Sequence, residues 1–233
     1  MTIGSLFSGI GGLELGLEMC GLGPVKWQAE CDPYARAVLA KHWPSVKRYA
    51  DVREIDETAE RVDIICGGFP CQDISSAGRK VGISGKKSAL WFEYVRVLCG
   101  LRPRYAFVEN VGALTGRGLD RVLGGLAAIG YDAEWGVLGA CVSGAPHSRK
   151  RLFVLAYADR DGEPAGPIDA QTSGLRANAA LMRDWRPSPP ARVRMDDGVS
   201  GGLDRLRCLG NAVVPAQAAL AWRTLYGRIT STP

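Results

Sequence analysis

The chain has 233 residues, of which 46% are hydrophobic and 23% are charged, and its formal net charge is +5. Such a composition belongs to a globular chain that buries a full core, and it excludes fibrous, disordered and membrane-spanning classes. The seven cysteines include no CxxC pair and only two histidines are present, which argues against a disulfide framework and against a zinc site. We therefore expect a cytoplasmic protein without a metal site or a membrane contact.

Strands and helices alternate through the first two thirds of the chain. Apolar runs that end at glycine or polar residues predict strands over residues 2–7, 25–30, 62–68, 104–110, 132–140 and 151–158, and a short strand before Asp51. Helical spacing predicts helices over residues 13–20, 33–42, 88–100 and 117–129, and a last helix from Pro215. This alternation is typical of an α/β fold with a doubly wound, mostly parallel sheet. Residues 159–205 show no clear element.

The segment DIICGGFPCQDISS, residues 63–76, carries the most informative local signal. An apolar strand ends there in two glycines, and Pro70 fixes its own φ, so Cys71 stands on a stiff turn. Open α/β sheets build their sites outside the carboxyl ends of the strands. Cys71 therefore has the placement of a nucleophile.

A glycine turn, Phe7–Gly12, follows the first strand and opens a helix. Its glycines let the backbone approach a ligand, but Glu14 stands where the dinucleotide fingerprint has its third glycine. Glu30 ends the second strand, where an acid suits the two hydroxyls of a ribose, and Asp51 suits an adenine amino group. Together these residues predict a nucleoside cofactor without a pyrophosphate, which S-adenosylmethionine fits. Each of them alone also fits a plain turn or a strand end.

Two further groups follow later strands. Glu109 ends an apolar strand and is expected to face the same cleft as Cys71, where partial burial would raise its pKa. Arg149 and Arg151 lie two residues apart, so on an extended backbone they share a face and suit a phosphate and a carbonyl. Asn211 stands where it would cap or tie neighbouring loops. Taken singly, each of these residues also fits a structural role.

The motifs FSGIGG, GGFPCQDIS, ENV, HSRKR and GNAVVP occur in an order that resembles the DNA cytosine-C5 methyltransferase family, from about residue 5 to residue 222. FPCQ and ENV at this spacing are the most specific part of the resemblance. It implies a Rossmann-like class I methyltransferase fold, S-adenosylmethionine as cofactor and double-stranded DNA as partner. The product would be 5-methylcytosine, in a phage or restriction–modification setting.

The resemblance also implies roles for individual residues. Cys71 would attack C6 of a flipped-out cytosine, Glu109 would hold N3 and the exocyclic amine, and Arg151 would contact the base carbonyl. Arg149 would contact a phosphate or the Cys71 loop. The cofactor would be surrounded by Phe7, Ser8, Gly9, Gly11, Gly12, Glu30, Cys31, Asp51, Val52, Gly68, Pro70, Leu90, Asn211 and Ala212. DNA would be contacted by Gln72, Ser75, Lys80, Lys86, Lys87, Arg186, Arg192 and Arg194.

The chain departs from the family in its short target-recognition region. We expect a catalytic and cofactor-binding domain over residues 1–157, a recognition region over residues 158–207, and a C-terminal motif and helix over residues 208–233. The short region leaves three alternatives open: a very short target site, a homo-oligomer, or a partner protein that completes recognition.

Three other functions are weighed against this one. RNA as substrate is disfavoured by the residues Gln72-Asp73-Ile74 after the nucleophile, since the tRNA-methylating branch of the family usually differs there. An idle binding module is disfavoured by the intact set of Cys71, Glu109 and Arg151. A cysteine hydrolase fits poorly, because neither His42 nor His147 lies in a recognisable partner motif.

Overall fold

The structure is a computed structural model that describes residues 1–70, 90–158 and 200–231. Within these ranges one sheet has the strand order β3-β2-β1-β4-β5-β7-β6. Its strands are β1 (Ile3–Leu6), β2 (Val25–Ala29), β3 (Lys47–Tyr49), β4 (Ile64–Gly67), β5 (Tyr105–Val111), β6 (Tyr131–Leu138) and β7 (Arg151–Ala158). The α-helices are α1 (Gly12–Glu18), α2 (Pro33–His42), α3 (Leu90–Leu101), α4 (Leu119–Ala128), α6 (Ser200–Asn211) and α7 (Pro215–Ser231).

The predicted doubly wound, mostly parallel sheet is confirmed. Neighbouring strands run parallel from β3 to β5, whereas β7 is antiparallel to both β5 and β6. An antiparallel pair needs no helical crossover, and β6 is joined to β7 by residues 139–150, which contain only a short 3-10 turn. Each strand predicted from the sequence is present, and its ends differ from the prediction by at most two residues.

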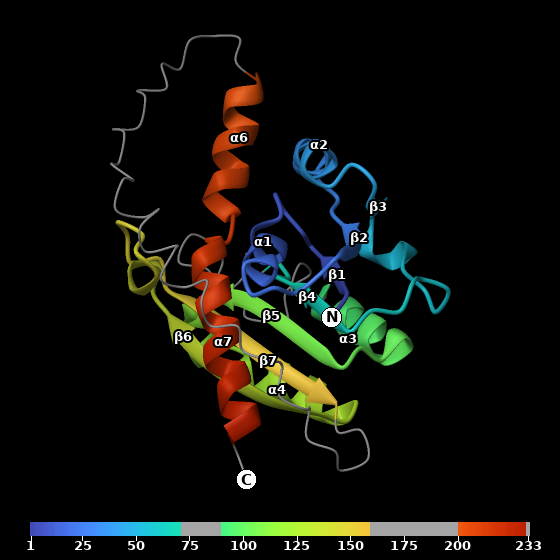
Figure 1. Ribbon diagram of the computed structural model, residues 1–233, viewed down its shortest axis with the longest axis vertical. Helices are drawn as coiled ribbons and strands as arrows, with labels where there is room; N and C mark the ends of the chain where they lie inside the picture. The colour runs from blue at the N-terminus through green and yellow to red at the C-terminus, as the bar shows by residue number, and fades with distance from the viewer. Residues whose placement is uncertain (71–89, 159–199, 232–233) are drawn as a thin grey trace.

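Helices cover both faces of the sheet (Figure 1). On one face α1 and α7 pack together, and the core there contains Leu17, Phe107 and Trp222. A Cβ atom at Gly16 would lie 2.7 Å from the Cβ of Ala218, so the two helix axes approach as closely as they do only because this position has no side chain. On the other face α3 and α4 cover a second core.

The helix α6 corrects one expectation. The sequence predicted no element within residues 159–205 and placed Asn211 in a linking segment, yet α6 runs from Ser200 to Asn211. Glycines at three of its twelve positions lower the helix propensity, which hid the element. Helix α6 contacts α2, and Figure 1 shows it end to end with α7. The proposed boundary between residues 207 and 208 falls inside this helix, and the domain division stays a prediction.

The order of the strands reverses between β1 and β4, the place where an open α/β sheet forms its ligand-binding crevice. The chain moves outward from β1 through β2 to β3 and then returns to β4 on the other side of β1. Ligands of open α/β sheets bind where the order reverses in this way, outside the carboxyl ends of the strands. Leu6 and Gly67 end the two strands as paired residues. The turn after β1 and the segment after β4 therefore leave the sheet side by side.

Candidate active site at the carboxyl ends of the strands

The turn between β1 and α1 has an unusual backbone. Phe7 has a φ of 53°, and Gly9 and Gly11 have φ values of 57° and 90°. A left-handed backbone conformation costs free energy for a bulky residue such as Phe7. Residues in such conformations cluster at active sites and ligand-binding sites. Ser8 is buried, and its backbone N–H donates to the carbonyl of Ala29, which holds the turn against β2.

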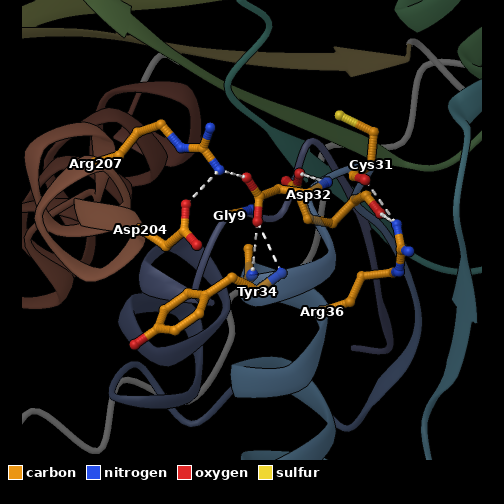
Figure 2. A network of polar contacts seen from close by, with 9 residues as sticks. Gly9, Cys31, Asp32, Tyr34, Arg36, Asp204 and Arg207 are labelled. Carbon is orange, nitrogen blue, oxygen red and sulfur yellow. Dashed lines mark hydrogen bonds and ion pairs between the residues drawn. The ribbon is translucent and has the colours of Figure 1, made fainter. Parts of the chain in front are cut away.

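Glu30 fastens this turn to the end of β2. One carboxylate oxygen accepts from the backbone N–H of Gly9 at 2.8 Å, and the other accepts from the N–H of Asp32, also at 2.8 Å. Arg36 donates to the carbonyls of Glu30 and Cys31 (Figure 2). Glu30 is half-buried and Cys31 is exposed. The acid that the sequence assigned to a ribose is thus anchored by backbone bonds at the edge of the crevice.

Asp32 links this edge to α6, a contact that the sequence analysis missed. One oxygen of Asp32 caps α2 by accepting from the N–H groups of Tyr34 and Ala35, as the Asp-Pro step predicted. The other oxygen pairs with Arg207, which also pairs with Asp204 in its own helix (Figure 2). The two residues of the ion pair are 175 positions apart in the sequence, so no local sequence pattern predicts the contact.

Asp51 and Val52 follow β3. The Asp51 carboxylate caps a 3-10 turn over Val52–Glu54 by accepting from the N–H of Arg53, and it also forms an ion pair with the Arg53 side chain at 3.3 Å. The expected contact of Asp51 with an adenine amino group stays a prediction, in which the side chain would use its remaining acceptor capacity.

Glu109 is buried near the end of β5 and is only 8% exposed. Its Oε1 atom lies 2.8 Å from Nε of Arg151, on the adjacent strand β7. Burial raises the pKa of Glu109 from its ordinary 4.5 to about 7, against the lowering effect of the positive charges on Arg151 and Arg149. The predicted rise in pKa is therefore confirmed. A carboxyl group with this pKa exchanges a proton readily near neutral pH.

The segment that leads to Cys71 lies directly against Glu109. A Cβ atom at Gly68 would stand 2.7 Å from Oε2 of Glu109, so only glycine fits there beside the carboxylate as it stands. The neighbouring Asn110 donates from Nδ2 to the carbonyl of Phe69 at 3.0 Å and accepts from the N–H of Val111. Glu109 and Asn110 thus contact the chain at Gly68 and Phe69, just before Pro70, the last residue described ahead of Cys71. The positioning role of Asn110 was not predicted from the sequence.

The predicted nucleophile and eight of the predicted DNA-contacting residues fall in the ranges that the structure leaves undescribed. They are Cys71, Gln72, Ser75, Lys80, Lys86, Lys87, Arg186, Arg192 and Arg194. Their roles stay predictions.

Arg149 joins the arginine motif to the last motif. Its guanidinium donates to the carbonyls of Gly210 and Ala212, at 2.6 and 2.9 Å. The buried Gln217 of α7 in turn donates to the carbonyl of Arg149 at 3.1 Å. These contacts show a structural role for Arg149 that the sequence did not predict, while its expected contact with a phosphate or with the Cys71 loop stays untested.

The last motif approaches the glycine turn from the other side. A Cβ atom at Gly12 would lie 2.4 Å from the carbonyl oxygen of Val213, so the two segments touch through their backbones. A cavity of about 310 Å³ adjoins them and is lined in part by Ile10, His147 and Arg149. Asn211 is the last residue of α6, and the next residue, Ala212, lines this cavity together with Gly12. Gly12 of the first motif and Ala212 of the last motif, both predicted cofactor residues, are thus brought together.

The remaining predicted cofactor residue, Leu90, opens α3 and packs half-buried against the core beneath that helix. Within residues 1–70, 90–158 and 200–231, no three side chains of His, Cys, Asp or Glu gather in a way that suits a metal ion. No helix in the same ranges is long and apolar enough to cross a membrane.

Known proteins resemble this chain in both sequence and fold. It is 38% identical over 169 residues to the type II methyltransferase M2.BsuMI of Bacillus subtilis (strain 168), covering 69% of this chain and 43% of that one. It is 32% identical over 225 residues to the type II methyltransferase M.CviJI of Paramecium bursaria Chlorella virus IL3A, covering 95% of this chain and 58% of that one. The chain therefore spans about half the length of these relatives.

A solved structure of DNMT2 from Spodoptera frugiperda matches with a TM-score of 0.58 at 20% identity, covering 72% of this chain and 53% of that one, which shows a common fold. The profile of the C-5 cytosine-specific DNA methylases matches residues 1–179. By this match and by its relatives, the chain belongs to the C-5 cytosine-specific DNA methylase family.

Proposed function

We propose that the chain transfers a methyl group from S-adenosylmethionine to C5 of cytosine in double-stranded DNA, giving 5-methylcytosine. The observation that carries the proposal is the placement of Glu109, a buried carboxyl with a pKa of about 7 that lies against the segment leading to Cys71. Membership of the family supports the same reaction.

The residues around the crevice between β1 and β4 fit the proposed cofactor. A Cβ atom at Gly9 would meet nothing within 4 Å, so there is room for a ligand beside this part of the turn, and Glu30 offers acceptor oxygens at the end of β2. When bound, S-adenosylmethionine supplies an electrophilic methyl group on its sulfonium. The turn Phe7–Gly12 would hold the nucleoside end against Glu30 and Asp51, and no pyrophosphate site is required.

Cys71 would act on the base as the nucleophile, and Glu109 would act as the proton donor. The Cys71 thiolate would add to C6, which turns C5 into an enamine carbon that accepts the methyl group. Loss of the C5 proton would then expel the thiolate and restore the aromatic ring. Glu109 in its protonated form would donate to N3 of the cytosine, which draws electrons from C6 and favours the addition. Arg151 would keep the carboxyl group oriented and contact the base carbonyl.

The target cytosine is stacked inside the duplex, so it would have to flip out to reach this site. The proposed DNA contacts lie in the nucleophile loop and in residues 158–207. Because the latter region is short, a very short target site, a second copy and a partner protein stay the three proposed routes to target recognition. The relatives named type II methyltransferases favour a restriction–modification or phage setting.

The reaction is tested with methyl-labelled S-adenosylmethionine and separate pools of duplex DNA and tRNA. We expect label in DNA, and bisulfite sequencing of the product should place it at C5 of cytosine in a defined context. Label in tRNA alone would contradict the proposed substrate. Cys71→Ser should abolish transfer, whereas Cys99→Ser, at an exposed thiol of α3, should leave it unchanged.

The covalent step has its own test. DNA that carries 5-fluorocytosine in the preferred context cannot lose the substituent at C5 as a proton, so the adduct with Cys71 should accumulate as a stable cross-link. A wild-type protein that methylates DNA yet never forms this cross-link would disprove the covalent route while leaving the reaction itself intact.

A further inference from the structure

A row of polar side chains is buried beneath the glycine turn. Gln28 of β2, Ser5 of β1 and Cys66 of β4 are paired across the three strands, so they stand at one level on the sheet. Glu14 of α1 covers this row, and all four residues have no exposed surface. A fully buried carboxyl group requires partners, because an unpaired charge in a dry interior is strongly disfavoured.

Glu14 and Gln28 share one hydrogen bond, and each side chain also has one buried oxygen atom that lacks a partner. Nε2 of Gln28 donates to Oε1 of Glu14 at 3.3 Å. The other oxygen of each side chain, Oε2 of Glu14 and Oε1 of Gln28, is buried and has no donor. Both atoms are acceptors as long as Glu14 is ionised, so neither can satisfy the other. A single proton on Oε2 of Glu14 supplies the missing donor and satisfies both atoms at once.

We propose that Glu14 is a permanently neutral carboxylic acid whose Oε2 donates to Oε1 of Gln28, so that the acid and the amide form a two-bond clip between α1 and β2. The clip makes Glu14 a positioning residue for the cofactor site, a consequence that rests on the function proposed above. No covalent bond changes in the clip, and the proton is the one that the carboxyl group carries at low pH.

The groups that face Glu14 favour this state. Burial raises the pKa of Glu14, and this effect outweighs the lowering effect of the nearby polar groups of Ser5, Gln28 and Ser8. Burial raises the pKa of Cys66, which faces Glu14 from β4, well above its usual value, so Cys66 stays a neutral thiol. None of the ion pairs formed by the described residues includes Glu14.

The clip closes a ring of contacts around the turn. On β2, Glu30 lies two residues after Gln28, and its carboxylate accepts from the N–H of Gly9. On the helix side, Gly12 lies two residues before Glu14, and its backbone touches the last motif at Val213. Helix α1 has no side-chain cap at its first residue, so its position relative to β2 depends on contacts further along. A charge on Glu14 would push it away from Gln28 Oε1 and shift the turn that the cofactor uses.

The protonation state is tested directly by carbon NMR of protein labelled at the glutamate carboxyl carbons. We expect one carboxyl resonance at the neutral position up to about pH 8, above the titration of Glu109, and expect it to vanish in Glu14→Gln. An ionised Glu14 at that pH would overturn the proposal. This measurement needs no cofactor and no activity.

Positioning is tested by the affinity for S-adenosylmethionine measured by calorimetry. Glu14→Gln keeps both hydrogen bonds through its amide and should bind within about twofold of wild type, whereas Glu14→Ala leaves Gln28 without partners and should bind roughly tenfold more weakly. The double variant Glu14→Gln with Gln28→Glu keeps one acid and one amide with their places exchanged, so it should also bind within about twofold of wild type. If this double variant folds with wild-type thermal stability but binds weakly, the clip does not position the site. A wild-type protein that binds no S-adenosylmethionine would refute the proposed function but not the neutral acid.

Discussion

Arg151 and Glu109 meet across two antiparallel strands, with Nε of the arginine 2.8 Å from Oε1 of the acid. Arg151 is paired with Val111, two residues beyond Glu109, so the ion pair is diagonal and joins side chains of one sheet face. The pair lies where β5 and β7 approach the segment that follows β4. The other carboxylate oxygen of Glu109, Oε2, lies beside Gly68, three residues before Cys71 in the sequence.

Replacing Glu109 with glutamine should slow methyl transfer by about 10²–10⁴-fold, because the amide cannot supply the proton that N3 of the cytosine would receive. Binding of S-adenosylmethionine should change little, since the glycine turn and Glu30 are untouched. Single-turnover rates with excess enzyme are the appropriate measurement. Glu134→Gln, at a partly exposed acid of β6, serves as the matched control. An unchanged rate in Glu109→Gln would remove this residue from the site.

The same substitution should change how stability depends on pH. The folded pKa of Glu109 is raised from 4.5 to about 7, so its stabilising contribution is complete below pH 4.5 and is lost as the pH rises towards 7. Over that window wild type should lose up to about 1.4 kcal/mol per pH unit relative to Glu109→Gln. Urea unfolding at a series of pH values measures this slope. Parallel curves for the two proteins would mean that the acid is not destabilised by burial.

Asn110→Asp separates the two hydrogen bonds of this side chain. The carboxylate keeps the acceptor for the N–H of Val111 but loses the donor to the carbonyl of Phe69. We expect a loss of about 1 kcal/mol in the free energy of unfolding and a fall in the methylation rate, with S-adenosylmethionine affinity close to wild type. Thermal unfolding and steady-state kinetics test both parts. A normal methylation rate would show that the Phe69 carbonyl does not need this bond.

Much of the sheet and the composition of the site could be predicted from local patterns. The strand that ends at Gly67 and the apolar strand before Glu109 are continuous buried runs, and this is why the rise in the pKa of Glu109 was also predictable. Motif order then placed the first and last motifs in one site, which the close approach of Gly12 and Val213 agrees with.

The features that escaped prediction depend on contacts between distant segments. The direction of β7 is not encoded in its own periodicity, because parallel and antiparallel strands both alternate their side chains. The bonds from Arg149 to Gly210 and Ala212, and the ion pair from Arg207 to Asp32, join residues at least 61 positions apart. Helix α6 itself was hidden for the same reason, since its glycines weaken the local signal and its support comes from α2.

The ion pair between Arg207 and Asp32 should anchor α6 without contributing much to overall stability. Arg207 is 58% exposed at its side chain, and exposed pairs contribute about 0–1 kcal/mol. Asp32→Asn keeps a good helix cap for α2 but removes the charge, so amide hydrogen exchange should quicken near residues 207–211 and stay unchanged within α2. High salt should have the same effect on wild type. Unaltered exchange in both conditions would show that other contacts hold α6.

Gly68→Ala tests how closely the nucleophile segment must approach the acid. The added Cβ would lie 2.7 Å from Oε2 of Glu109, the free end of a side chain, so the fold can relieve the clash by moving the carboxylate. We therefore expect a folded protein in which Glu109 is displaced from Arg151. The rate of methyl transfer should fall at least about tenfold, because a misplaced catalytic group no longer meets the substrate in the reactive geometry. Gly116→Ala is the control, because a Cβ there meets nothing within 4 Å. Equal activity of the two variants would mean that Glu109 can act from a shifted position, and a crystal structure of Gly68→Ala would show where it went.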